Sequence, residues 1–296
     1  MSVSDEILKR MADAYRRIRN TARYLLANLD GFNPETDCVA TKDLLYLDRW
    51  ILEQTHQLQD EIVSAYQTYQ FHQIYQKLHH YCVVTLGGFY LDIIKDRMYT
   101  CQPDSHARRS AQTTMYYVAE AFACWLAPIL SFTAEEIWKY LPGDHSESIF
   151  LEEWYEKLPK AEAIDNHWEK IVMVREEVSK ELEKLRVTGA IGSSLDAEIE
   201  IYANDDFKSS LDTLEDELRF VLITSYARVY DADKRPDDAV ASELDGLWLK
   251  VLPSEHVKCI RCWHHREDVG NNSDHPEICG RCIDNIEGAG EQRQYC

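Results

Sequence analysis

The sequence predicts a mainly α-helical protein: an antiparallel helical bundle, a small α+β junction module and a C-terminal four-cysteine module resembling a zinc ribbon. Three observations lead to this fold class. Apolar residues recur every three or four positions through most of residues 4–127, residues 196–202 alternate, and two Cys-x2-Cys pairs lie near the C-terminus. With 296 residues the chain is long enough for two or three domains. We expect them at 1–160, 161–253 and 254–296.

Four long segments each carry one apolar stripe, which is typical of helices in a bundle: 4–29, 43–70, 72–95 and 106–127. The first stripe is Ile7, Met11, Ala14, Ile18, Ala22, Leu25 and Leu29. Ser4 can cap the first helix, Asp30-Gly31 can end it, and Pro128 ends the fourth. The pair Gly87-Gly88 lowers helix propensity and predicts the close approach of another helix. A capping box at Thr133–Glu136 predicts a short helix ending at Leu141.

The pattern changes after about residue 160. Residues 166–187 predict one more helix, ended by Gly189, and the alternation of 196–202 predicts a half-buried strand. A helix is expected at 208–218, with further strands at Phe220–Ile223 and Leu247–Val251. The acidic stretch 231–245 reads as an exposed loop of the same module.

The cysteine pairs, Cys259 with Cys262 and Cys279 with Cys282, are separated by sixteen residues and can close a tetrahedral shell around one Zn²⁺. A shell of four thiolates is structural, because it leaves no position open for catalysis. Two disulfides in a secreted domain and a rubredoxin-like iron are the alternatives. The sequence shows no signal peptide or membrane-spanning run, and its other cysteines are scattered. We therefore expect a reduced, cytoplasmic protein without membrane contact.

The net charge of −20 argues against indiscriminate binding of nucleic acid, but the charge is uneven. Residues 9–23 carry six basic side chains and one acid, and Arg16, Arg19 and Arg23 share one helical face with Asn20 beside them. Lys95 and Arg97 form a second basic cluster. Arginine and asparagine side chains bind phosphates and base edges of RNA, whereas a solvated helix face is the alternative. No phosphate loop or nucleophile elbow indicates an enzyme site.

Five stretches resemble the anticodon-binding domain of bacterial isoleucyl-tRNA synthetases, which are class I enzymes; they are Tyr15–Leu29, Asp48-Arg49-Trp50, Phe89–Arg97, Arg108–Thr113 and Trp125–Trp138. Valyl and leucyl enzymes share a weaker form of these motifs. The cysteine module, with Cys279-Gly280-Arg281-Cys282 and Asn285, points to the isoleucyl family. The resemblance covers essentially the whole chain.

The resemblance implies that this chain grips the anticodon arm of isoleucine tRNA. The tRNA-facing residues that we expect are Arg16, Arg19, Asn20, Arg23, Lys95, Arg97, Trp263, His264 and Arg281. Trp263 is the one aromatic residue between the cysteine pairs. It can stack on a base or serve as the apolar anchor of its module.

The family's His-Ile-Gly-His and Lys-Met-Ser-Lys-Ser signatures and its editing domain have no counterpart here. The chain therefore reads as a C-terminal fragment with an engineered Met1, inactive alone and monomeric. ATP and isoleucine would bind only the missing catalytic domain, its partner within one polypeptide. The alternative is a non-enzymatic helical adaptor whose zinc ribbon binds protein, which the acidic second half of the chain favours.

Overall fold

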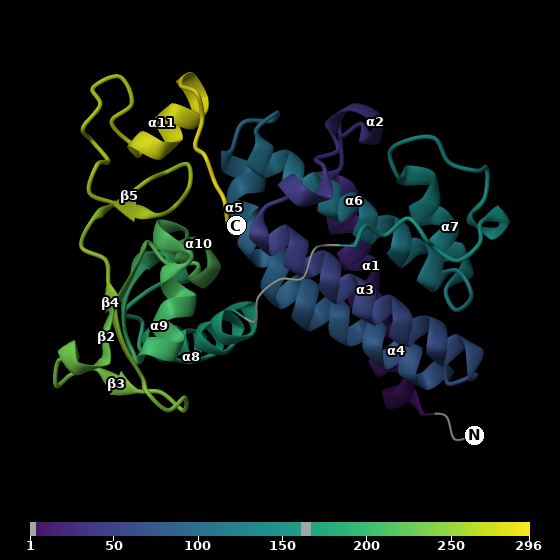
Figure 1. The fold of residues 1–296 in the computed structure, drawn as a ribbon, viewed down its shortest axis with the longest axis horizontal. Coiled ribbons are helices and arrows are strands. Elements are labelled where there is room, and N and C mark those ends of the chain that lie inside the picture. Colours follow the sequence, from purple (N-terminus) through teal and green to yellow (C-terminus); the bar gives the residue numbers. More distant parts are fainter. Residues whose placement is uncertain (1–3, 161–166) are drawn as a thin grey trace. The chain divides into compact units, whose positions relative to one another are not determined.

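A computed structural model describes residues 4–160 and 167–296 and divides the chain into two compact units (Figure 1). The first unit is Met1–Met98 with His106–Glu162, and the second is Tyr99–Ser105 with Ala163–Cys296. The division of the second part at residues 253 and 254 stays a prediction. The predicted domain limits at residues 1 and 161, and the predicted start of a helix at residue 166, lie outside the described residues.

The first unit is the expected helical bundle (Figure 1). The interior is formed mainly by α1, α3, α4 and α6, whose apolar stripes face one another. Its elements are α1 (Asp5–Asn28), α2 (Pro34–Asp37), η1 (Thr41–Asp43), α3 (Tyr46–Gln67), α4 (Phe71–His80), the π-helical segment η2 (Tyr81–Tyr90), α5 (Leu91–Thr100) as far as Met98, α6 (His106–Leu126), α7 (Ser131–Tyr140) and the 3-10 turn η3 (Ile149–Leu151).

Helix α1 begins as predicted, because the hydroxyl of Ser4 accepts a hydrogen bond from the Ile7 amide at 3.3 Å. Its apolar stripe is buried from Ala14 onward. Ile7 and Met11, which begin the stripe, are exposed. The apolar period gives the face of a helix but not how far along that face the neighbouring helices reach.

The third predicted helix is interrupted by the π-helical segment η2. At its end the Leu91 amide donates to the carbonyl of Leu86, five residues back. A Cβ at Gly87 would lie 2.7 Å from the carbonyl oxygen of Cys82. The expectation that Gly87-Gly88 admits a neighbouring helix is therefore wrong, since the atoms nearest to both glycines belong to the preceding wide turn of the same segment.

The prediction of a capping box at Thr133 is also wrong. Helix α7 starts two residues earlier, at Ser131, and the hydroxyl of Thr133 lies 3.0 Å from the Tyr15 hydroxyl. The Glu135 carboxylate instead accepts hydrogen bonds from Ser148 and from the amide of Ile149, at the start of η3. These contacts tie the segment after α7 back onto that helix.

A fully buried ion pair joins α3 to α5. The Asp48 carboxylate accepts hydrogen bonds from Nη1 of Arg97 at 2.9 Å, from the Tyr90 hydroxyl at 2.7 Å and from the hydroxyl of Ser110. Both charged side chains are 0% exposed. The prediction that Arg97 faces tRNA is therefore wrong, because its guanidinium neutralises a buried carboxylate.

A second buried carboxylate, Glu120 of α6, holds the segment that follows α7. It accepts hydrogen bonds from the hydroxyls of Tyr116 and Tyr155, and Nε2 of His145 lies 3.0 Å from its Oε1. Burial raises the pKa of Glu120, but the hydrogen bonds from His145 and the two tyrosines outweigh burial and leave the pKa lowered. The pKa of His145 is raised, chiefly by its hydrogen bond to Glu120.

We expect this network to make the stability of the bundle depend on pH. A raised histidine pKa stabilises the fold below the unfolded value of 6.5, and this contribution is lost as pH rises through the higher folded value. A lowered glutamate pKa stabilises above 4.5, and this contribution is lost as pH falls through the lower folded value. The expected optimum lies between those limits.

Thermal unfolding between pH 6 and 8.5 checks this prediction. The unchanged chain is expected to lose stability over this range, and His145→Gln is expected to remove part of that loss. His72→Gln is the matched control, because His72 is exposed on α4. An identical pH profile for His145→Gln and the unchanged chain would contradict the prediction.

The second unit contains a four-stranded sheet in the order β2-β1-β4-β3 and a two-stranded hairpin, β5-β6. In the sheet β1 pairs parallel with β2 and antiparallel with β4. The elements are α8 (His167–Val187), η4 (Ser194–Asp196), β1 (Ala197–Ala203), α9 (Asp205–Asp212), η5 (Glu215–Glu217), α10 (Leu218–Leu222), β2 (Tyr226–Asp231), η6 (Ala232–Lys234), β3 (Val240–Ala241), β4 (Leu247–Pro253), β5 (Val257–Lys258), β6 (His265–Arg266) and α11 (Gly280–Glu287).

The predicted strands at 196–202 and 247–251 are confirmed as β1 and β4. The predicted strand Phe220–Ile223 is wrong, because Leu218–Leu222 is the short helix α10 and Ile223 ends it in a left-handed conformation. A short continuous apolar run has no periodicity that separates a buried helix from a buried strand. The strand that pairs with β1 begins later, at Tyr226.

The helices that the structure describes include none that is both long enough and apolar enough to cross a membrane. Cys82 and Cys124 are buried free thiols. Burial raises the pKa of each thiol to about 12, so neither is a reactive thiolate.

Candidate metal centre and nucleic-acid interface

The four cysteines of the C-terminal module converge on one point. Cys259 and Cys262 lie in the turn after β5, Cys279 precedes α11, and Cys282 lies in the first turn of that helix. Their sulfur atoms all lie within 4.8 Å of one another, and all four residues are buried. The short hairpin and the start of a helix thus each supply two thiols.

The sulfur distances fit a tetrahedral zinc ion. Sγ of Cys259 lies 3.7 Å from that of Cys282, and Sγ of Cys262 lies 3.7 Å from that of Cys279. Zinc–sulfur bonds of about 2.3 Å give a regular tetrahedron with edges of about 3.8 Å. A disulfide needs about 2.05 Å between sulfurs, so the disulfide alternative does not fit these distances.

The surroundings of the thiols also suit thiolates. The Cys279 amide donates to Sγ of Cys259 at 3.4 Å, and the positive end of the α11 dipole lies at Cys279 and Cys282. The apolar core of the module consists of the cysteines and Ile278, with Val269 and Ile283 packed against them. A core this small needs a metal to be stable.

Trp263 does not belong to that core. Its side chain is 61% exposed, directly after the Cys259–Cys262 turn, and its backbone has φ = 67°. The left-handed conformation costs free energy in a residue other than glycine. The reading of Trp263 as the apolar anchor is therefore wrong, and a role in stacking stays a prediction.

Two other predicted contacts of the module point inward. His264 is buried, with Nδ1 3.2 Å from the Cys262 carbonyl oxygen and its ring edge-on to Phe220. Arg281 forms an ion pair with Glu291 at 3.2 Å, and its guanidinium lies 5.0 Å from the Phe220 ring centroid. The expectation that these two residues face RNA is therefore wrong, because both side chains are engaged in contacts within the second unit.

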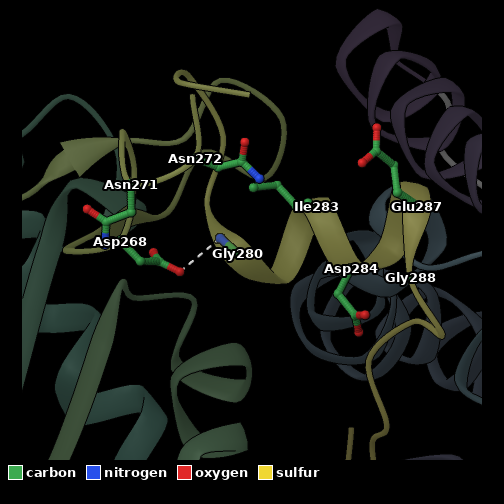
Figure 2. A pocket seen from close by; sticks show the side chains of 8 residues that line it. All are labelled: Asp268, Asn271, Asn272, Gly280, Ile283, Asp284, Glu287 and Gly288. Atoms are coloured by element: carbon green, nitrogen blue, oxygen red, sulfur yellow. Dashed lines mark hydrogen bonds between the residues drawn. The ribbon is translucent and has the colours of Figure 1, made fainter. Parts of the chain in front are cut away.

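The hollow beside α11 is acidic (Figure 2). Its lining includes Asp268, Asp284 and Glu287, whose carboxylates point in different directions. Asp268 accepts a hydrogen bond from the Gly280 amide at 2.8 Å, which satisfies one of the free amides at the start of α11. Negative charge makes this hollow unsuitable for a phosphate.

The basic stripe of α1 is exposed as the sequence predicts. Arg16 pairs with Asp13 at 2.9 Å, and Arg19 lies 3.7 Å from Glu136 of α7. The side chains of Asn20 and Arg23 are exposed and have no hydrogen-bond or ion-pair partner within the described ranges 4–160 and 167–296. These two groups are available to a ligand without the loss of an internal contact.

The second basic cluster is divided by the structure. Lys95 is exposed and pairs with Asp92 at 2.8 Å, whereas Arg97 is buried against Asp48. The two residues lie two positions apart on α5 and so point in different directions. Only Lys95 remains a candidate for contact with tRNA.

Sequence reasoning missed an open groove at the end of α1. It has a volume of about 850 Å³ and is lined by Asn20, Arg23 and Tyr24 of α1 together with Tyr140 and Pro142 at the end of α7. Tyr140 carries no local signal, because its place beside α1 arises only from packing between helices far apart in sequence.

Comparisons with known proteins agree with this geometry. Residues 48–201 match the family model of the anticodon-binding domain of tRNA ligases, which covers more than half of the chain. Residues 258–285 match the model of the zinc finger found in FPG and IleRS, and this range contains all four cysteines. The zinc finger match supports structural zinc over iron, whereas the sulfur distances fit a tetrahedral site of either metal.

The chain is similar over its whole length to isoleucine–tRNA ligases of several bacteria. The identity is 60% for Nitrosococcus oceani, 56% for Methylococcus capsulatus and 55% for Azotobacter vinelandii, with 100% of this chain aligned in each case. The chain spans 32% of the length of each of these relatives.

Proposed function

Because this chain belongs to the family of anticodon-binding domains of tRNA ligases, we propose that it holds the anticodon arm of isoleucine tRNA as part of a longer isoleucine–tRNA ligase. The proposed contacts on the first unit are Arg16, Arg19, Asn20, Arg23 and Lys95. The family membership argues against the protein-binding adaptor as the alternative.

The exposed stripe of α1 is the observation that carries this proposal. In a chain of net charge −20, it gathers cations on one face and leaves Arg23 and Asn20 unpaired among the described residues. Guanidinium groups bind phosphates through two parallel hydrogen bonds, and a primary amide both donates to and accepts from a base edge. The acidic remainder of the surface disfavours other polyanions.

The C-terminal module supports the proposal by its fold. The thiolates of Cys259, Cys262, Cys279 and Cys282 would hold one Zn²⁺, and a closed shell of this kind supplies folding free energy to residues 254–296. Trp263 is then presented to solvent on a turn fixed by two of the ligands. Its indole offers a flat surface on which an unpaired base can stack.

The other parts of the proposal follow from the resemblance and the relatives. Residues 1–160 form the anticodon-binding bundle, 161–253 the junction module and 254–296 the zinc module of a cytoplasmic, monomeric enzyme. The ATP-dependent attachment of isoleucine, and its editing, belong to a catalytic domain and an editing domain of the same polypeptide. The chain alone then binds tRNA without activating an amino acid.

Binding over a salt series tests this function. We expect the chain to bind isoleucine tRNA at least about tenfold more tightly than a tRNA of another specificity. Arg23→Gln is expected to weaken binding and to lower the salt slope by about 1, as loss of one phosphate contact does. Arg10→Gln is the matched control, because Arg10 is exposed on the same helix and pairs with Glu6.

Equal affinity for both tRNAs, with a steep salt slope, would mean that binding is nonspecific and would contradict the anticodon assignment. An unchanged slope for Arg23→Gln would remove the stripe of α1 from the interface.

A further inference from the structure

The groove at the end of α1 has the size of a ligand site. Its volume of about 850 Å³ lies within the range of about 300–1,000 Å³ that small-molecule sites occupy. Its lining includes the turn Asp30-Gly31, where Gly31 has φ = 72° and no atom within 4 Å of an added Cβ. The backbone there is open to an approaching flat group.

The polar face of α1 leads into this groove. Arg16, Asn20, Arg23 and Ala27 follow spacings of three and four, so they share one helical face, and the last three line the groove. Asn20 and Arg23 are also the two stripe residues whose side chains lack a partner within the described residues. The groups available for hydrogen bonding are thus at the groove itself.

Two tyrosines give the groove aromatic surfaces. Tyr24 is held in place, because its hydroxyl donates to the Leu91 carbonyl at 3.4 Å. Tyr140 is 73% exposed in the last turn of α7. An exposed phenol ring beside an unpaired amide and a guanidinium is the combination that unstacked bases of RNA use: a surface for stacking, a group for the base edge and a cation for the phosphate.

We propose that the groove receives one unpaired base of an RNA loop, stacked on Tyr140, with its edge at the Asn20 amide and its phosphate at Arg23. The assignment rests on the proposed tRNA-binding function and adds to it the place where a single base is held. RNA is favoured over a protein segment because the cationic face of α1 continues beyond the groove to Arg16. An RNA backbone carries successive phosphates, which can each contact a cation along such a face.

The test uses the full chain and a stem-loop RNA with the anticodon arm of isoleucine tRNA. Tyr140→Ala is expected to weaken binding about tenfold or more, since it removes the stacking surface. Tyr140→Phe is expected to bind as the unchanged chain does. Phe132→Ala is the matched control, because Phe132 is an exposed aromatic residue in the first turn of the same helix. Circular dichroism confirms that each variant is folded.

The second part of the test changes the RNA instead of the protein. A stem-loop with abasic nucleotides in its loop is expected to bind the unchanged chain and Tyr140→Ala equally weakly, because there is no base left to stack. The salt slope is expected to be the same for Tyr140→Ala and the unchanged chain, since the phosphate contacts remain.

The groove assignment is overturned if Tyr140→Ala binds the intact stem-loop as tightly as the unchanged chain does. It is also overturned if AMP binds as tightly as the stem-loop, which would identify a free-nucleotide site. These results leave the preference for isoleucine tRNA intact. If the unchanged chain binds no RNA, both the groove assignment and the proposed function fail.

Discussion

Replacing Asp48 with asparagine is expected to lower the free energy of unfolding of the helical bundle by about 3–5 kcal/mol. Asp48 and Arg97 are each 0% exposed, and the carboxylate also accepts hydrogen bonds from Tyr90 and Ser110. Asparagine keeps the shape of the side chain but removes its charge, so the buried guanidinium of Arg97 loses the counter-ion that Asp48 supplies. Desolvation of that cation is the source of the cost.

Chemical denaturation followed by helical circular dichroism measures this loss. Asp92→Asn is the matched control, because Asp92 pairs with Lys95 on the surface of α5. Surface pairs contribute about 0–1 kcal/mol, so the control is expected to change stability little. A loss of less than about 1 kcal/mol for Asp48→Asn would mean that water reaches the pair.

Replacing Cys259 with serine is expected to abolish zinc binding and to unfold residues 254–296. The unchanged chain is expected to carry one zinc. Structural zinc contributes about 10–16 kcal/mol of apparent binding free energy in zinc-finger peptides, and the core of this module contains few apolar residues besides the cysteines. The bundle is expected to keep its own unfolding transition.

Elemental analysis and limited proteolysis measure the two effects separately. Cys38→Ser is the control, because Cys38 is a free thiol in the first unit. It is expected to retain the metal and a protease-resistant tail. Zinc that remains at one per chain in Cys259→Ser would show that Cys259 is not a ligand, and an unchanged chain without metal would contradict the site.

The parts of the fold that sequence predicts well are those with long-range repetition or fixed spacing. Helices α1, α3 and α6 follow from apolar residues repeated over five or more turns, and the thiol cluster follows from two Cys-x2-Cys pairs. Short elements were less predictable. The run Phe220–Ile223 is too short to show a period, so its helical conformation depends on packing against the rest of the fold.

The errors in the candidate site share one cause. The resemblance predicts that Arg97, His264 and Arg281 face tRNA, yet each has a partner inside the fold. These partners are Asp48, the Cys262 carbonyl and Glu291. A polar side chain does not reveal its partner until the chain is folded. The basic residues of α1 lie on one exposed face, as the sequence predicts, because helical spacing alone fixes that face.

The π-helical segment between α4 and α5 has a consequence for the rotational phase of α5. In an α-helix each residue turns the chain by about 100°, and a wider turn advances it by less. The number of residues in Tyr81–Tyr90 therefore sets the direction in which Arg97 leaves α5. One residue more or fewer would rotate its guanidinium by about 100°, away from Asp48. An insertion or deletion in Tyr81–Tyr90 would therefore break the ion pair between Arg97 and Asp48 without changing either residue.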